Sequence, residues 1–140
     1  MASATDRSQL RILVVDEQSS VRVLLVSVLQ REGYQVLPFE TADAALEELR
    51  QRPAHLIIAD RSDPGVDGID LHMRARTIQP AIQSILINSV PGREANAAAE
   101  REGVREYVIK PFRVDDVLAV CEAAMKLVQF AVAGQDPLPS

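Results

Sequence analysis

The sequence has little cysteine and no long apolar run. Its one cysteine in 140 residues, Cys121, cannot form a disulfide within the chain, and this favours a reducing compartment. No apolar run reaches the ~18 residues that a membrane-spanning helix needs. The first ten residues, MASATDRSQL, contain no apolar core of a secretory signal. We therefore expect a cytoplasmic protein with no membrane-spanning segment.

Positive charge is also scarce. The chain has 15 Lys and Arg against 20 Asp and Glu, a formal net charge of -5. Because nucleic-acid binders usually carry a basic face, we do not expect direct binding of nucleic acid. The acidic residues are spread along the chain, and there is no repeat or low-complexity segment. The length suits one domain that buries its core without disulfides.

Short apolar runs alternate with segments of helical periodicity. The runs have the length and composition of strands buried on both faces. Strands are predicted at 11–16, 34–39, 55–60, 84–89 and 106–109, and helices at 19–33, 41–52, 68–76, 93–103 and 114–130. This alternation predicts an α/β fold, an open, doubly wound parallel sheet with helices on both faces. Residues 1–9 and 131–140 are expected to be tails, the second of them a tail or the start of a linker.

Local signals place several element ends. Ser19 or Ser20 can cap the first helix, and Gly33 can end it in the left-handed conformation. Thr41 is the predicted cap of the second helix. Pro38, within the second strand, indicates a strand at the edge of the sheet.

The first predicted helix has more apolar residues than one core-facing stripe requires. The stripe is expected to comprise Val21, Leu24, Leu25, Val28 and Leu29. Val23 and Val26 lie off this stripe. Isolated surface valines need no special cause, so two interpretations remain open: ordinary surface residues, or a docking patch for a partner.

Polar residues follow four of the predicted strands. Asp16 and Glu17 end the first, Asp60 ends the third, Asn88 ends the fourth, and Lys110 follows the fifth. Taken singly, such an Asp is most often a cap or turn former, and such a Lys a solvated loop residue. In open parallel sheets, however, the carboxyl ends of the strands together form the binding edge.

Carboxylates gathered at one edge repel one another, so they need a cation to be stable there. Oxygen ligands without nitrogen or sulfur suit a hard ion such as Mg²⁺. A carboxylate held beside a metal and a lysine can accept a phosphoryl group, because the two cations neutralise the charge that is transferred.

Three segments resemble the signature segments of bacterial response regulator receiver domains. They are ILVVDE at 12–17, LIIADRSDPGVDG at 56–68 and YVIKPF at 107–112, and their spacing matches as well. The resemblance covers roughly residues 11–130, so 10–130 is expected to be the receiver domain. It implies a flavodoxin-like sheet with strand order 2-1-3-4-5 and a role in two-component phosphorelay signalling with Mg²⁺.

The resemblance also implies residue roles. Asp60 corresponds to the phosphoacceptor, which takes its phosphoryl group from a phosphohistidine of a sensor kinase or histidine phosphotransfer protein. Asp16 and Glu17 correspond to the acidic pair that holds Mg²⁺ together with Asp60 and the backbone carbonyl of Ser62. Lys110 corresponds to the lysine that contacts the phosphoryl group.

Two positions depart from the family pattern, and a third matches it. Glu17 stands where the family usually has Asp, one methylene shorter. Asn88 stands at the switch position, where the family has Thr or Ser; a shift of one residue would bring Ser89 there instead, and both assignments remain open. Tyr107 fills the aromatic switch position.

The resemblance implies a domain that catalyses its own phosphorylation and dephosphorylation but turns over no external substrate, so its status as an enzyme is left open. The output domain or effector protein, and pairing into a homodimer, are also left open. The alternative function is a degenerate receiver that binds proteins independently of phosphorylation. Asp60 and Lys110 argue against this alternative, whereas Asn88 and Glu17 keep it open.

Three further residues are given ordinary roles. His55 and His72 have no cysteine or second histidine near them in the sequence, so neither is expected to bind a metal. Cys121 lies on the apolar stripe of the last predicted helix and is expected to be an unreactive core residue.

Overall fold

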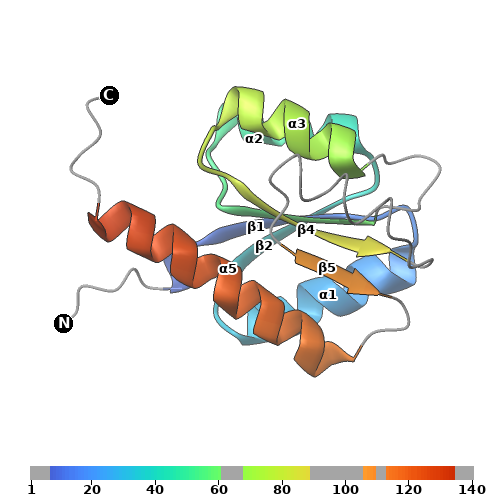
Figure 1. Cartoon of the computed structure of the whole chain (residues 1–140). Coiled ribbons are helices and arrows are strands. Elements are labelled where there is room, and N and C mark those ends of the chain that lie inside the picture. Colours follow the sequence, from blue (N-terminus) through green and yellow to red (C-terminus); the bar gives the residue numbers. More distant parts are fainter. Residues whose placement is uncertain (1–6, 61–67, 89–105, 110–112, 135–140) are drawn as a thin grey trace.

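The computed structural model describes residues 7–60, 68–88, 106–109 and 113–134 (Figure 1). For residues 7, 60, 88, 106–109 and 127–134 the backbone alone is described. The predicted helix at 93–103 and the residues Ser62, Ser89 and Lys110 lie outside these ranges.

A five-stranded parallel sheet forms the centre of the fold. Its strands are β1 (Arg11–Val15), β2 (Gln35–Phe39), β3 (Leu56–Asp60), β4 (Gln83–Asn88) and β5 (Glu106–Ile109). The strand order is β2-β1-β3-β4-β5, and every pairing is parallel, as the sequence predicts. β2 is an edge strand, in agreement with the position of Pro38.

Helices cover both faces of this sheet. A short 3-10 helix, η1 (Arg7–Gln9), precedes β1, and the α-helices are α1 (Ser19–Arg31), α2 (Ala42–Gln51), α3 (Gly68–Ile78) and α5 (Val114–Gly134). α1 and α5 lie on one face, and α2 and α3 lie on the other (Figure 1). α5 continues past Phe130, where the sequence pattern placed its end.

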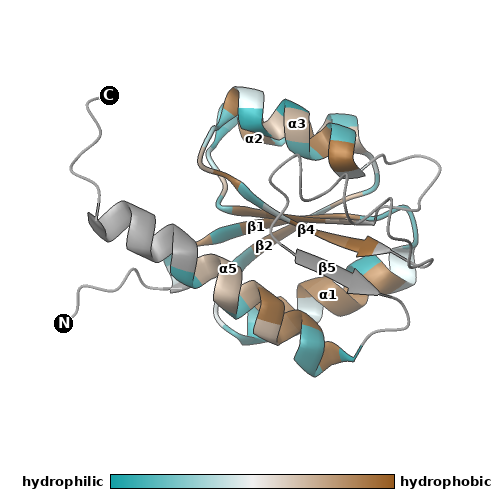
Figure 2. Cartoon of the chain, viewed as in Figure 1, coloured by the Kyte–Doolittle hydropathy of each residue, from teal (hydrophilic) through white to brown (hydrophobic). Residues whose placement is uncertain are grey.

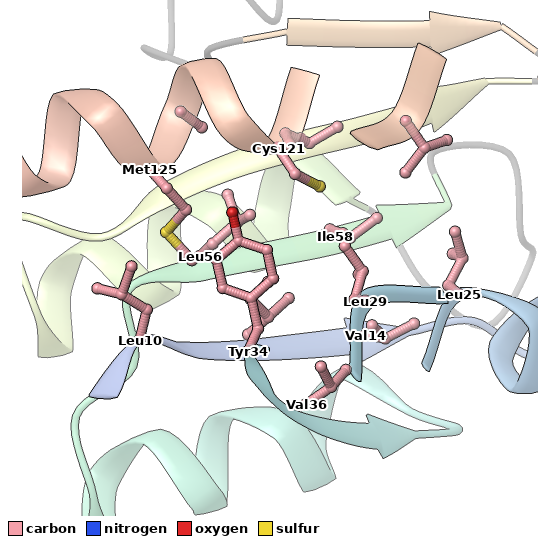
Figure 3. Close-up of a cluster of buried hydrophobic side chains, with 14 of the residues drawn as sticks. Leu10, Val14, Leu25, Leu29, Tyr34, Val36, Leu56, Ile58, Cys121 and Met125 are labelled. Carbon is pink, nitrogen blue, oxygen red and sulfur yellow. The ribbon is translucent and has the colours of Figure 1, made fainter. Parts of the chain in front are cut away.

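The core has two halves, one on each face of the sheet. Val14 and Ile58 belong to the half under α1 and α5, whereas Leu13 and Ile57 belong to the half under α2 and α3. This two-sided burial explains why the strands are continuous apolar runs (Figure 2). In the first half, the ring of Tyr34 lies among strand residues and Met125 of α5 (Figure 3).

The buried face of α1 differs from the predicted stripe. Leu25 and Leu29 are buried as expected, but Leu24 is 42% exposed. Val26, which was placed off the stripe, is partly buried and packs against the core, while Val23 is 64% exposed. The helix is therefore rotated toward Val26, and the exposed apolar pair is Val23 and Leu24.

The ends of the first two helices follow the predicted signals in part. Gly33 has a φ of 100°, in the left-handed region, and its N–H donates to Gln30. The Thr41 side chain accepts from the Ala44 N–H at 3.2 Å. The predicted capping of α1 by Ser19 or Ser20 is wrong, because the cap position is Gln18 and no side chain caps the helix there.

A polar clamp holds the amino-terminal edge of the sheet. The Arg11 N–H donates to His55 Nδ1 at 3.0 Å, and the His55 N–H donates to the Arg11 carbonyl at 2.9 Å. The Arg11 guanidinium contacts Glu48 Oε2 at 2.7 Å and the Pro53 carbonyl at 2.6 Å. The Gln79 side chain bonds both backbone groups of Ala54. The chain before β3 is thereby tied to β1, α2 and the end of α3.

We expect the fold to lose stability when His55 is protonated. Burial, and then the charge of Arg11, lowers the pKa of His55 below its usual 6.5. As the pH falls, the unfolded chain therefore takes up this proton first. The contribution of His55 is complete above pH 6.5 and is lost as the pH falls through the lower pKa of the folded state. Urea unfolding at about pH 7.5 and at about pH 5.5 gives the free energy of unfolding at each pH. This free energy should decrease more between the two pH values in wild type than in His55→Gln. Equal decreases in the two proteins would contradict this role of His55.

We also expect Cys121 to be unreactive in the folded protein. Its side chain is buried in the core, on the inner face of α5, and burial raises the pKa of its thiol to about 12. The reactive thiolate is therefore nearly absent at neutral pH. Ellman's reagent should label Cys121 only after denaturant is added. Rapid labelling of the native protein, at a rate near that of a small free thiol, would contradict its burial.

Candidate functional site

The pairing of β1 with β3 brings two acidic positions together. Val15 pairs with Ala59 across these parallel strands, so the next residues, Asp16 and Asp60, stand at the same level of the sheet. On the other side of β3, Asp60 pairs with Ile87 of β4. The site is therefore assembled by the register of the sheet, from segments far apart in the sequence.

The pairing of β4 with β5 continues the same edge. Asn88, the last residue of β4, pairs with Ile109, the residue before Lys110 in the chain. Tyr107 pairs with Leu86, two residues before Asn88. The structure thus places Asn88 directly after the β4 residue that pairs with Asp60, and it places Tyr107 one strand farther away, on β5. Lys110, Ser62 and Ser89 lie outside the described residues.

Asp16 is a buried carboxylate at this edge of the sheet. Its residue is 1% exposed, its N–H donates to the Phe39 carbonyl at 3.1 Å, and its Oδ1 accepts from the Gln18 N–H at 2.8 Å. Glu17, the next residue, is exposed. Burying a carboxylate costs free energy unless charge or hydrogen bonds compensate for it. Since open parallel sheets bind ligands at their carboxyl edge, the buried Asp16 is a candidate ligand-binding residue.

The donor set fits Mg²⁺ in chemical type. Asp16 and Glu17 offer carboxylate oxygens, which hard cations prefer, and Asp60 contributes a third acidic position through the sheet register. Among the side chains that the structure describes, no three His, Cys, Asp or Glu residues are gathered as metal ligands. The third predicted ligand, Asp60, is described by its backbone alone.

The sequence analysis missed Arg22. This α1 residue donates from Nη1 to the Asp16 carbonyl at 2.5 Å and to the Glu17 carbonyl at 3.5 Å. A basic residue in the first turn of a helix is unusual, because the helix dipole favours acidic residues there. That departure was a signal in the sequence that Arg22 has a specific partner.

A small groove adjoins the site on the α1 side. It has a volume of about 330 Å³ and is lined by Arg22, Val23, Val26, Ser27 and Pro38. The two valines of the predicted docking patch therefore line one hollow between α1 and the edge strand β2. Of the two, Val26 is partly buried and Val23 is exposed.

The remaining candidate residues have structural partners. His72 Nδ1 lies 2.6 Å from Ser84 Oγ, and both residues are buried between α3 and β4. His55 belongs to the clamp with Arg11. Cys121 is a core residue, as predicted. In the described part of the chain, no helix has the length and apolar character needed to cross a membrane.

Comparison with known proteins identifies the family. Residues 12–122 match the family model described as response regulator receiver domain. The chain is 29% identical over 107 residues to sporulation initiation phosphotransferase F of Bacillus subtilis, covering 76% of this chain and 86% of that one. It is 30% identical over 108 residues to the response regulator receiver protein CpdR of Brucella abortus, covering 77% of this chain and 90% of that one.

Larger regulators match over one part of their length. The Escherichia coli transcriptional regulator NtrC is 29% identical over 118 residues, covering 84% of this chain and 25% of that protein. The chain therefore spans about a quarter of the NtrC relatives.

Solved structures agree on the fold. The signal receiver domain of an HD domain-containing protein from Pseudomonas fluorescens has a TM-score of 0.83 at 27% identity, covering 97% of this chain and 98% of that one. The beryllofluoride-activated NtrC4 receiver domain dimer has a TM-score of 0.78 at 26% identity, covering 84% of this chain and 97% of that one. The sheet order, the acidic residues beyond β1 and the match over residues 12–122 lead to one conclusion: this chain belongs to the response regulator receiver domain family.

Proposed function

We propose that Asp60 is the phosphoacceptor of this receiver domain and that Asp16 and Glu17 hold Mg²⁺ beside it. The observation that carries this proposal is the pairing of Val15 with Ala59, which sets Asp60 next to the buried Asp16. The backbone carbonyl of Ser62 and the ammonium of Lys110 are assigned by resemblance to the family.

The chemistry is transfer of a phosphoryl group from a phosphohistidine. A carboxylate oxygen of Asp60 forms the new P–O bond, the P–N bond to the donor imidazole breaks, and that imidazole leaves with a proton from water. When bound, Mg²⁺ would neutralise negative charge on the transferring group. Asp16 and Glu17 would hold the cation, and Lys110, assigned by resemblance to the family, would supply a second positive charge.

Asn88 and Tyr107 are proposed to transmit the modification. Phosphorylation adds about -1.5 to -2 charge at the sheet edge, which recruits new hydrogen-bond donors. An Asn side chain can donate an N–H to a phosphoryl oxygen, although it lacks the small rotating hydroxyl of Thr or Ser. The register supports Asn88 over Ser89, because Asn88 ends β4 directly opposite the residue that precedes Lys110.

Receiver domains act together with sensor kinases or phosphotransfer proteins and with output domains. We propose a histidine kinase or histidine phosphotransfer protein as the phosphodonor, and the groove at Val23 and Pro38 as a docking point for it. We leave the output open between an appended domain, an effector protein and a second copy of the chain. The lone cysteine supports a cytoplasmic location.

A degenerate receiver, active only as a binding module, is the second candidate. The replacement of the usual Asp by Glu17 and of the usual hydroxyl by Asn88 favours it. Binding of Mg²⁺ and reaction with a small phosphodonor separate the two candidates, because a degenerate receiver needs neither.

With Mg²⁺ and acetyl phosphate, we expect the protein to gain one base-labile phosphoryl group, seen by intact-protein mass spectrometry. Asp60→Ala should abolish the gain. Asp70→Ala, which removes an exposed carboxylate of α3, should be labelled like wild type. Labelling of Asp60→Ala to the wild-type level would show that another residue is the acceptor, and no labelling of wild type would favour the degenerate receiver.

Asn88→Thr should strengthen the switch, because it restores a hydroxyl at the position opposite Ile109. The measurement is the change in NMR shifts around Tyr107 when beryllofluoride is added, which should be larger in Asn88→Thr than in wild type. Ser89→Ala is the control and should respond like wild type. An unchanged response in Asn88→Thr together with a lost response in Ser89→Ala would assign the switch to Ser89.

A further inference from the structure

The loop between β1 and α1 carries the acidic pair, Asp16 and Glu17. The helix that follows it, α1, begins without a capping side chain. The residue at the cap position, Gln18, has extended backbone angles (φ -79°, ψ 116°), and its side chain makes no capping hydrogen bond. Helices that lack a capping side chain leave the chain before their first turn less firmly held. The conformation of this loop must therefore be fixed by other contacts.

Two contacts hold the loop in the absence of a capping side chain. Asp16 Oδ1 accepts from the Gln18 N–H at 2.8 Å, closing a short turn. From inside the helix, Arg22 donates to the Asp16 carbonyl at 2.5 Å and more distantly to the Glu17 carbonyl at 3.5 Å. The first contact uses an oxygen of the very carboxylate that the proposed metal site needs. The second uses only backbone carbonyls and leaves both carboxylates available.

We infer that Arg22 is a positioning residue for the acidic pair, an inference that rests on the proposed Mg²⁺ site. Its guanidinium fixes the two peptide units from which the side chains of Asp16 and Glu17 depart. Fixing these units limits the directions in which the two carboxylates can point. The longer side chain of Glu17 makes this restraint more important here, because each additional rotatable bond adds freedom that a ligand must lose on binding.

The sign of the charge effect makes this role testable. Arg22 brings a positive charge close to the proposed cation site, so Coulomb repulsion alone predicts that its removal tightens Mg²⁺ binding. A positioning role predicts the opposite, since partners that orient metal ligands typically contribute about 10–100-fold in metal affinity. The two explanations cannot produce the same result.

Arg22 also joins the site to the neighbouring groove. The same residue lines the hollow formed with Val23, Val26, Ser27 and Pro38. A partner that docks in this groove therefore contacts the residue that holds the acidic loop. A partner bound in the groove can therefore affect the proposed metal site through the side chain of Arg22 and the two backbone carbonyls that it contacts.

The test measures Mg²⁺ dissociation constants by isothermal titration calorimetry for wild type, Arg22→Gln, Arg22→Lys and Arg31→Gln. Arg31 is an exposed residue in the last turn of α1, so its variant makes the same charge change at the far end of the helix. We expect Arg22→Gln to bind Mg²⁺ about tenfold more weakly than wild type, and Arg22→Lys, which keeps a donor, to recover part of that loss. Arg31→Gln should bind like wild type.

Thermal unfolding followed by circular dichroism accompanies each titration, so that a loss of affinity is separated from a loss of fold. Equal or tighter binding by Arg22→Gln would overturn the positioning role while leaving the metal site intact. If Arg22→Gln does not fold, Arg22→Met, which keeps an aliphatic side chain but has no donor, takes its place, and wild-type affinity in that variant would overturn the role. A wild-type protein that binds no Mg²⁺ would instead overturn the proposed function, and the positioning role with it.

Discussion

The parallel pairing of β1 with β3 is the constraint on which the site depends. With Val15 opposite Ala59, the residues that follow the two strands meet at one level of the sheet edge. A slip of one residue would exchange the faces of every side chain in the strand, bury the wrong residues and separate Asp16 from Asp60. The apolar side chains that fill the two halves of the core therefore also fix the position of Asp16 relative to Asp60.

The sequence predicted the sheet well, because each strand is short, apolar and ended by turn residues. It also placed the polar strand ends, since parallel strands must present their carboxyl ends at a common edge. It failed on α1 in two ways. A 3.6-residue period left the choice between Leu24 and Val26 to the packing against the rest of the core. The basic side chain of Arg22 in the first turn was a usable signal, but its acceptors are two backbone carbonyls, which no residue type in the sequence marks. The start of the helix at Ser19 was predicted, but its cap position, Gln18, was not; the Gln18 N–H donates to Asp16, outside the helix.

The two edges of the sheet have different tasks. At the amino-terminal edge, Arg11, His55 and Gln79 form hydrogen bonds that tie neighbouring segments together. At the carboxyl edge, hydrogen bonds of Asp16 and Arg22 hold the loop that carries the proposed Mg²⁺ ligands. Because the whole length of the strands separates these groups, changes that stabilise the first edge need not disturb the second. Stability and binding can therefore be adjusted independently in this fold.

The burial of the only cysteine has a practical consequence for studying this domain. With Cys121 buried on the inner face of α5, the native protein presents no thiol to reagents in solution, so it needs no cysteine removal before site-specific labelling. A single cysteine introduced at the exposed Val23 would be the one accessible attachment point for a spin label or fluorophore. Such a probe would sit on the rim of the α1 groove and report directly on whatever comes to occupy it.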